Sequence, residues 1–140
     1  MPVLERSRIP LVALEDMNAV HYEEVDLINQ IDALLTRIES GAAEADELDA
    51  LLDALQDHMI EHFRGEEARM EASGFPPYPI HKGEHDRVLL ELGGLIDRWK
   101  RERDTAPVSR YIRETFPIWF EQHLGTMDAV TADFLARIGA

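Results

Sequence analysis

The chain has 140 residues, of which 45% are hydrophobic, and this is enough to bury the core of one domain without disulfide bonds. It contains no cysteine, which excludes zinc–thiolate sites, iron–sulfur clusters and cysteine nucleophiles, and which fits a reducing, cytoplasmic compartment. The net charge of −14 repels phosphate backbones and anionic lipid surfaces, so neither nucleic acid nor a membrane is an expected partner.

The N-terminal residues mix apolar and charged positions and lack the long apolar run of a signal peptide. We expect an ordered arm over residues 1–13 and a bundle over residues 14–138, within a single domain spanning residues 1–140. No segment approaches the roughly 20 apolar residues that a membrane-spanning helix requires.

Glycine and proline interrupt the chain at few places, and the segments between them show helical periodicity. The predicted helices cover residues 14–38, 45–72, 79–101 and 107–138, and the third begins at a first-turn proline. Pro117 lies inside the fourth helix, and we expect it to kink that helix or split it in two. Long helices joined by short loops predict an all-α protein, an up-down-up-down antiparallel four-helix bundle with an N-terminal arm.

Each of the four predicted helices carries at least one of the six histidines. His58 and His62 are four residues apart, and so are His81 and His85, so each pair lies on one helix face. Glu66 follows His62 at the same spacing. Mixed imidazole and carboxylate donors suit iron, manganese or zinc, and their number exceeds what one tetrahedral zinc needs. The pattern favours two metal ions with bridging carboxylates.

His123 and Asp128 are five residues apart, which in a regular α-helix turns their side chains about 140° away from each other. In an ideal helix they cannot both point straight at one metal centre, but long side chains and a distorted helix could bring both in, and Pro117 just upstream could cause such a distortion.

The order of these residues resembles that of the hemerythrins, in particular single-domain bacterial hemerythrin-like proteins of the HHE type. The matching stretches are residues 62–70, 81–85 and 119–128, preceded by His21 in the first helix. The resemblance implies two non-haem iron ions with an oxo or hydroxo bridge. It assigns His81, His85 and His123 to one iron, His21 and His62 to the other, and Glu66 and Asp128 to both as bridges.

The resemblance also implies that O₂ binds at the iron with two histidines, beside apolar residues. The pocket residues implied by the resemblance are Phe63, Trp119, Phe120 and Leu124. Apolar walls protect bound O₂ from water, as a carrier requires. The resemblance thus favours an O₂-binding protein for storage, delivery or sensing over a dedicated enzyme. We expect an unidentified reductant, and a monomer or weak homo-oligomer.

Two residues depart from the pattern of the O₂ carriers. Glu24 stands three residues after His21, where carriers place leucine or isoleucine, and His58 stands one turn before His62, where bacterial relatives often carry tyrosine. A buried carboxylate is costly unless it binds a metal or a hydrogen-bond donor, so Glu24 is an extra ligand or a partner of His58. The alternatives place Glu24 at the edge of the bundle and His58 in an outer or exposed position.

Glu23 and Glu67 are interpreted as solvated residues. A polar pocket would leave other functions open, namely a di-iron redox enzyme acting on peroxide, O₂ or nitric oxide, or an iron-responsive module. A helical interaction protein with incidental histidines is a further alternative.

Overall fold

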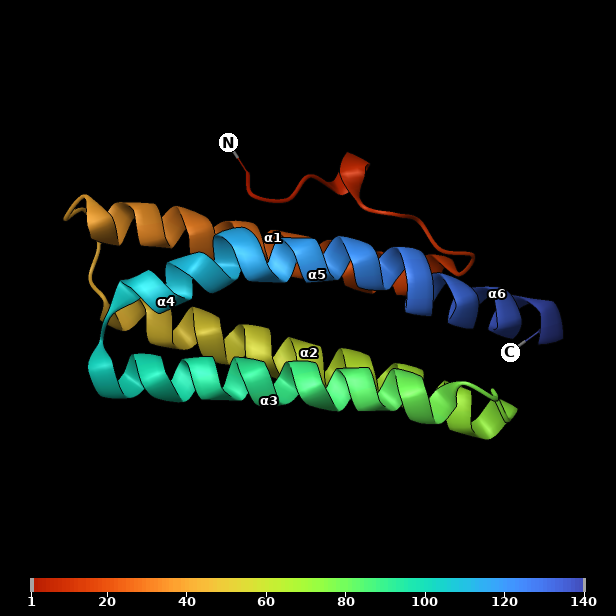
Figure 1. Cartoon of the computed structure of the whole chain (residues 1–140). Coiled ribbons are helices and arrows are strands. Elements are labelled where there is room, and N and C mark those ends of the chain that lie inside the picture. Colours follow the sequence, from red (N-terminus) through yellow and green to blue (C-terminus); the bar gives the residue numbers. More distant parts are fainter. Residues whose placement is uncertain (1, 140) are drawn as a thin grey trace.

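Four long helical rods account for almost all regular structure in the computed structural model, which describes residues 2–139 (Figure 1). The first three rods are α1 (Glu15–Glu39), α2 (Asp46–Ser73) and α3 (Tyr78–Glu102). The fourth rod is continuous and consists of α4 (Thr105–Arg110), η2 (Tyr111–Thr115), α5 (Phe116–His123), η3 (Leu124–Asp128) and α6 (Ala129–Ile138). The all-α four-helix bundle is therefore confirmed. Met1 and Ala140, the ends of the expected domain, lie outside the described residues.

The ends of the rods follow from local chemistry. Gly74 and Gly139 terminate α2 and α6 with φ angles of 68° and 73°, a left-handed conformation that glycine adopts without steric cost. Asp104 caps α4, because its carboxylate accepts a 3.0 Å hydrogen bond from the backbone N–H of Ala106. A proline in the first turn starts α3 without losing a helical hydrogen bond.

The fourth rod contains two π-helical turns, η2 and η3, one on each side of α5. In η2 the N–H of Phe116 donates to the carbonyl of Tyr111, five residues earlier, and Pro117 follows at the start of α5. Pro117 has no N–H to donate, so the change of hydrogen-bond pattern occurs where an α-helical bond would be missing. The rod changes direction between α4 and α5 but is not split (Figure 1).

The N-terminal arm packs along the outside of the bundle (Figure 1). Its residues Leu4, Ile9 and Val12 are buried. Two asparagines of α1 hold its backbone: Asn29 bonds both the N–H and the carbonyl of Leu4, at 3.0 and 2.8 Å, and Asn18 bonds those of Val12, at 2.9 and 3.0 Å. These contacts make the arm part of the fold.

The main apolar core fills the bundle toward the end where α1 meets α2. It is built from buried leucine, isoleucine and aromatic side chains of all four rods, such as Ile28, Leu52, Leu92 and Ile112. No helix in the described residues is long and apolar enough to cross a membrane.

Candidate metal centre

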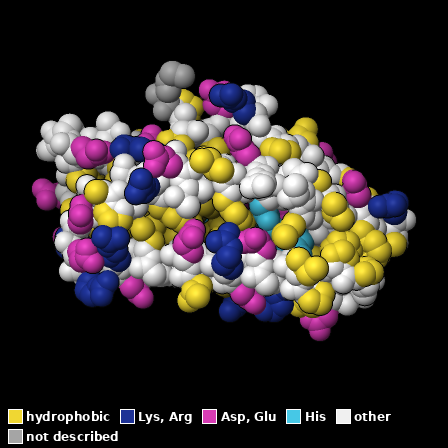
Figure 2. All heavy atoms as spheres, in the orientation of Figure 1, with side chains coloured by type: hydrophobic (Ala, Val, Ile, Leu, Met, Phe, Trp, Pro, Cys, Tyr) yellow, Lys and Arg dark blue, Asp and Glu magenta, His cyan; other side chains and the backbone are white. Residues whose placement is uncertain are grey.

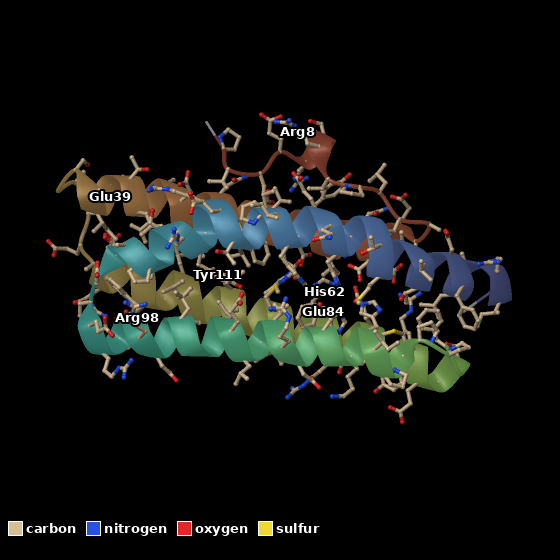
Figure 3. All side chains as sticks on the ribbon, viewed as in Figure 1. Arg8, Glu39, His62, Glu84, Arg98 and Tyr111 are labelled. Atoms are coloured by element: carbon tan, nitrogen blue, oxygen red, sulfur yellow. The ribbon has the colours of Figure 1, made fainter. Side chains whose placement is uncertain are left out.

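Seven buried histidine and carboxylate side chains meet between the rods. They come from α1 (His21), α2 (His62, Glu66), α3 (His81, His85) and the fourth rod (His123, Asp128). Figure 3 shows His62 in the space between the helices. Their donor atoms form two groups in which each atom lies within 4.8 Å of the others, one with His81, His85, His123 and Asp128 and one with His21, His62, Glu66 and Asp128. We call these the three-histidine group and the two-histidine group.

The two carboxylates lie between the groups and turn one oxygen toward each. Asp128 Oδ1 lies 3.1 Å from Nε2 of His81 and 3.1 Å from Nε2 of His123, whereas its Oδ2 lies 3.0 Å from Nε2 of His21. Glu66 Oε1 lies 3.4 Å from His85 Nε2, and its Oε2 lies 2.6 Å from His62 Nε2. This is the arrangement that two bridging carboxylates require.

The π turn η3 brings Asp128 into the site. The N–H of Ala129 donates to the carbonyl of Leu124, five residues earlier, so this turn contains one residue more than an α-helical turn. The extra residue removes most of the 140° offset that five α-helical residues would produce between His123 and Asp128. The distortion that brings both donors into the site is η3, directly between them, and the π turn η2 beside Pro117 is a separate irregularity.

Several donor atoms are buried without a hydrogen-bond partner among the described residues. They include both ring nitrogens of His21, Nε2 of His85, Oε1 of Glu66 and both carboxylate oxygens of Asp128. An unsatisfied buried polar group costs about 1–3 kcal/mol, and proteins rarely tolerate several in one place. Converging imidazole and carboxylate lone pairs are satisfied together by metal cations, so this donor set fits iron.

The charges in the site favour ionised carboxylates. Burial lowers the pKa of His21, but Asp128 and Glu66 outweigh burial and raise it to about 9. Burial raises the pKa of Asp128, but the adjacent imidazoles of His123, His21 and His81 hold it well below its usual range. Because a histidine binds metal through a deprotonated ring nitrogen, a bound cation takes the place of these protons.

Three histidines have a partner on the ring nitrogen opposite the site. With Nε2 facing the site, Nδ1–H of His62 donates to Glu24. Nδ1–H of His81 donates to Thr131 Oγ1 at 2.8 Å, and that of His85 donates to Glu67 Oε2 at 2.9 Å. Such partners fix the orientation of a ligand ring and increase its basicity.

Glu24 is fully buried and belongs to neither donor group. Its Oε1 also lies 3.5 Å from Nδ1 of His58, whose Nε2 is 2.7 Å from Oε2 of the exposed Glu23. The structure therefore places Glu24 behind His62, on the side away from Glu66. His58, with a side chain 21% exposed, connects Glu24 to the surface.

The interpretation of Glu67 as solvated is wrong, because its side chain is 16% exposed and bonds His85. Thr131 was not recognised from sequence at all. Its bond to His81 joins α6 to α3, 50 positions away, and helical periodicity does not report contacts between helices. The position of Glu67 could have indicated a role near the site, because it directly follows the predicted ligand Glu66 on α2.

The apolar residues expected around O₂ lie against histidines of both groups. Phe63 stacks on His85 with ring centroids 3.8 Å apart, and Trp119 stacks on His123 at 4.6 Å. Phe120 meets His21 edge-on at 6.0 Å, and Leu124 is fully buried. Phe120 thus covers the two-histidine group, whereas Phe63 and Trp119 cover mainly the three-histidine group.

Comparison with known proteins agrees with this geometry. Residues 12–135 match the family model described as the hemerythrin HHE cation binding domain. A bacteriohemerythrin of Aquifex aeolicus is 34% identical over 120 residues, covering 85% of this chain and 87% of the relative. A bacteriohemerythrin of Ralstonia nicotianae is 35% identical over 139 residues, covering 99% and 93%. No solved structure matches significantly. The chain therefore belongs to the hemerythrin family of non-haem iron-binding proteins.

Proposed function

We propose that this protein binds two non-haem iron ions joined by an oxo or hydroxo bridge, and that it binds O₂ at the iron of the two-histidine group. The observation that carries the proposal is the asymmetry of the site: one group has three histidines, the other has two, and Asp128 belongs to both. The similarity to two bacteriohemerythrins supports the same conclusion.

The protein contributes unequal donor sets. With Glu66 and Asp128 each giving one oxygen to each side, the three-histidine group offers five protein donors and the two-histidine group offers four. The second iron therefore has one position more for a small ligand. Iron, when bound, supplies a Lewis-acidic site and reversible one-electron oxidation.

The surroundings of the two-histidine group favour O₂ binding over the redox-enzyme alternative. Phe120 packs against His21, and the buried Leu124 follows on the same rod, so apolar surface covers the His21 side of the group. Glu24 contacts His62 through Nδ1, and its carboxylate is accordingly held on the far side of that ring from Glu66.

The reductant, the oligomeric state and the compartment are part of the proposal only. We propose an unidentified electron donor, a monomer or weak homo-oligomer, and a cytoplasmic location, the last supported by the absence of cysteine.

The test combines iron analysis with optical spectroscopy. The purified protein should contain two iron ions per chain. After anaerobic reduction, air should produce a visible absorption band that disappears on degassing and returns with air. Immediate irreversible oxidation without such a band would contradict O₂ carriage, and less than one iron per chain would contradict the metal centre itself.

A further inference from the structure

A hollow of about 230 Å³ lies between α1 and α2 beside the two-histidine group. Its apolar part comes from Met17 and Val20 of α1. On α2 it is lined by Glu61, Gly65 and Arg69, and at its base by the donors His62 and Glu66. We call it the α1–α2 hollow.

Solvent reaches the two-histidine group through these two donors. His62 is 8% exposed and Glu66 is 5% exposed, whereas His21 and Asp128 are 0% exposed. The two donors that keep some exposure are those that line the α1–α2 hollow. A small molecule can therefore approach this group from α1 and α2 without unfolding the bundle.

Other hollows lead to the three-histidine group instead. One is lined by Phe75, Ile80 and Val130 and reaches His81, and another reaches His123 beside Trp119. On the face in Figure 2, histidine surface (cyan) is visible between hydrophobic side chains. These openings provide a natural comparison, because they reach donors of the other group.

Charged side chains surround the α1–α2 hollow. Asp16 of α1 and Arg69 of α2 form a 2.6 Å ion pair across it, and Glu61 adds a second carboxylate. Besides the donor Glu66, two carboxylates and a single guanidinium line the hollow, in a protein whose net charge is already −14. An anion is repelled at this position, whereas a neutral diatomic molecule is not.

We propose that the α1–α2 hollow is the entry port for small ligands to the two-histidine group, and that Asp16 and Glu61 select neutral ligands over anions. The port rests on the proposed function, since it assumes that a ligand binds at that group. Val20 and Gly65 set its width, and Asp16, Glu61 and Arg69 together set its charge.

Filling the port tests the route. Val20→Phe should slow both O₂ binding to the reduced protein and azide binding to the oxidised protein by about tenfold, measured by stopped-flow absorbance. Gly65→Leu is a second filling variant that should fold, because a Cβ at Gly65 meets no heavy atom within 4 Å. The matched control, Val130→Phe, fills the hollow near His81 and should leave both rates within twofold of wild type.

Changing the charge tests the selection. Asp16→Asn removes one negative charge and should speed azide binding about threefold at low salt, as expected for one unit charge several ångströms from the path in water. It should leave the O₂ rate unchanged, and about 1 M salt should abolish the azide difference. Equal effects on azide and O₂ would overturn the selection.

A third measurement needs no iron. Dissolved O₂ is paramagnetic and increases the NMR relaxation of methyl groups that it approaches. In the metal-free protein, O₂ should relax the methyl group of Met17, which is 4% exposed and lines the port, several-fold more than that of Met59, which is 0% exposed in the core. Equal relaxation of the two methyl groups would overturn the port.

The outcomes separate the port from the proposed function. A wild-type protein that holds iron but binds neither O₂ nor azide contradicts the function. A protein that binds both, with rates that respond to Val130→Phe and not to Val20→Phe or Gly65→Leu, retains the function and overturns the port.

Discussion

Glu24, Thr131 and Glu67 occupy the Nδ1 side of three histidines whose Nε2 atoms face the metal centre. Each imidazole is thereby held in one orientation and one tautomer, and a charged acceptor also makes the ring a stronger donor. Two of the three acceptors are carboxylates. The geometry of the site therefore depends on residues that do not themselves belong to either donor group.

Replacing Glu24 tests this dependence. Glu24→Gln keeps the size of the side chain but removes the charge that faces His62, so Fe²⁺ should bind about tenfold more weakly, within the usual range for such partners. Competition against a coloured chelator under anaerobic conditions measures the change.

The neighbouring Glu23 provides the control for that experiment. Its side chain is 62% exposed and contacts His58, so Glu23→Gln should keep Fe²⁺ affinity within twofold of wild type. Equal losses in the two variants would mean that Glu24 acts through general negative charge and not through His62.

At the scale of the helices, sequence periodicity predicted the rods well and their internal irregularity poorly. The predicted boundaries 14–38 and 45–72 differ by one residue at each end from α1 and α2, because glycine breaks and the apolar stripes mark those ends clearly. The π turns could not be read in the same way, because one extra residue leaves no compositional mark. Only the awkward spacing of His123 and Asp128 indicated that a distortion was needed.

The sequence predicts the metal-site donors only where helical spacing reveals them. Pairs on one helix, such as His81 and His85, show themselves by spacing. The pairing of carboxylate oxygens between groups and the bond of Thr131 to His81 depend on how helices register against each other. That register is set by packing over the whole core, which a single sequence does not display.

The π turn η3 gives a paired prediction about chain length. Inserting one alanine after Thr126 rotates Asp128 by about 100° relative to His123, so the protein should lose most of its iron. Deleting Thr126 replaces the π turn by an α-helical turn and gives a four-residue spacing, about 40° apart, so most iron should remain. Iron-to-protein ratios measure both, and retention of iron by the insertion variant would contradict the role of η3.

The arm gives a prediction about stability. Asn29→Ala removes both hydrogen bonds to the backbone of Leu4 and should lower the free energy of unfolding by about 2 kcal/mol and the Tm by roughly 4–8 °C. Asp26→Asn is the control, because it removes only an exposed ion pair with Arg6 and should cost less than about 1 kcal/mol. Thermal denaturation followed by circular dichroism distinguishes the two.

At the scale of the whole molecule, the metal centre draws donors from every rod. Without cations, the buried atoms that lack partners oppose folding, whereas cations bound at the two groups together link all four rods. Iron binding and folding are accordingly coupled.

The coupling predicts the effect of metal removal. At a free Fe²⁺ concentration 100 times the Kd, binding adds about 2.7 kcal/mol to stability, which should raise the Tm by roughly 5–11 °C. Anaerobic calorimetry with Fe²⁺ and with a chelator measures this difference. His81→Ala should reduce the shift, and an identical Tm in both conditions would contradict the coupling.

The two π turns also restrict how this protein can be recombined with its relatives. Each π turn adds one residue and so shifts the position of every later side chain around the helix axis. The inward-facing positions of α4, α5 and α6 therefore do not follow one continuous 3.6-residue repeat. A chimera joined inside the fourth rod keeps its apolar face inward only if both parent proteins have these π turns at the same positions relative to the junction. Sequence alignments that close a one-residue gap near Thr126 would hide this requirement, and crossover points in the loop before Thr105 avoid it.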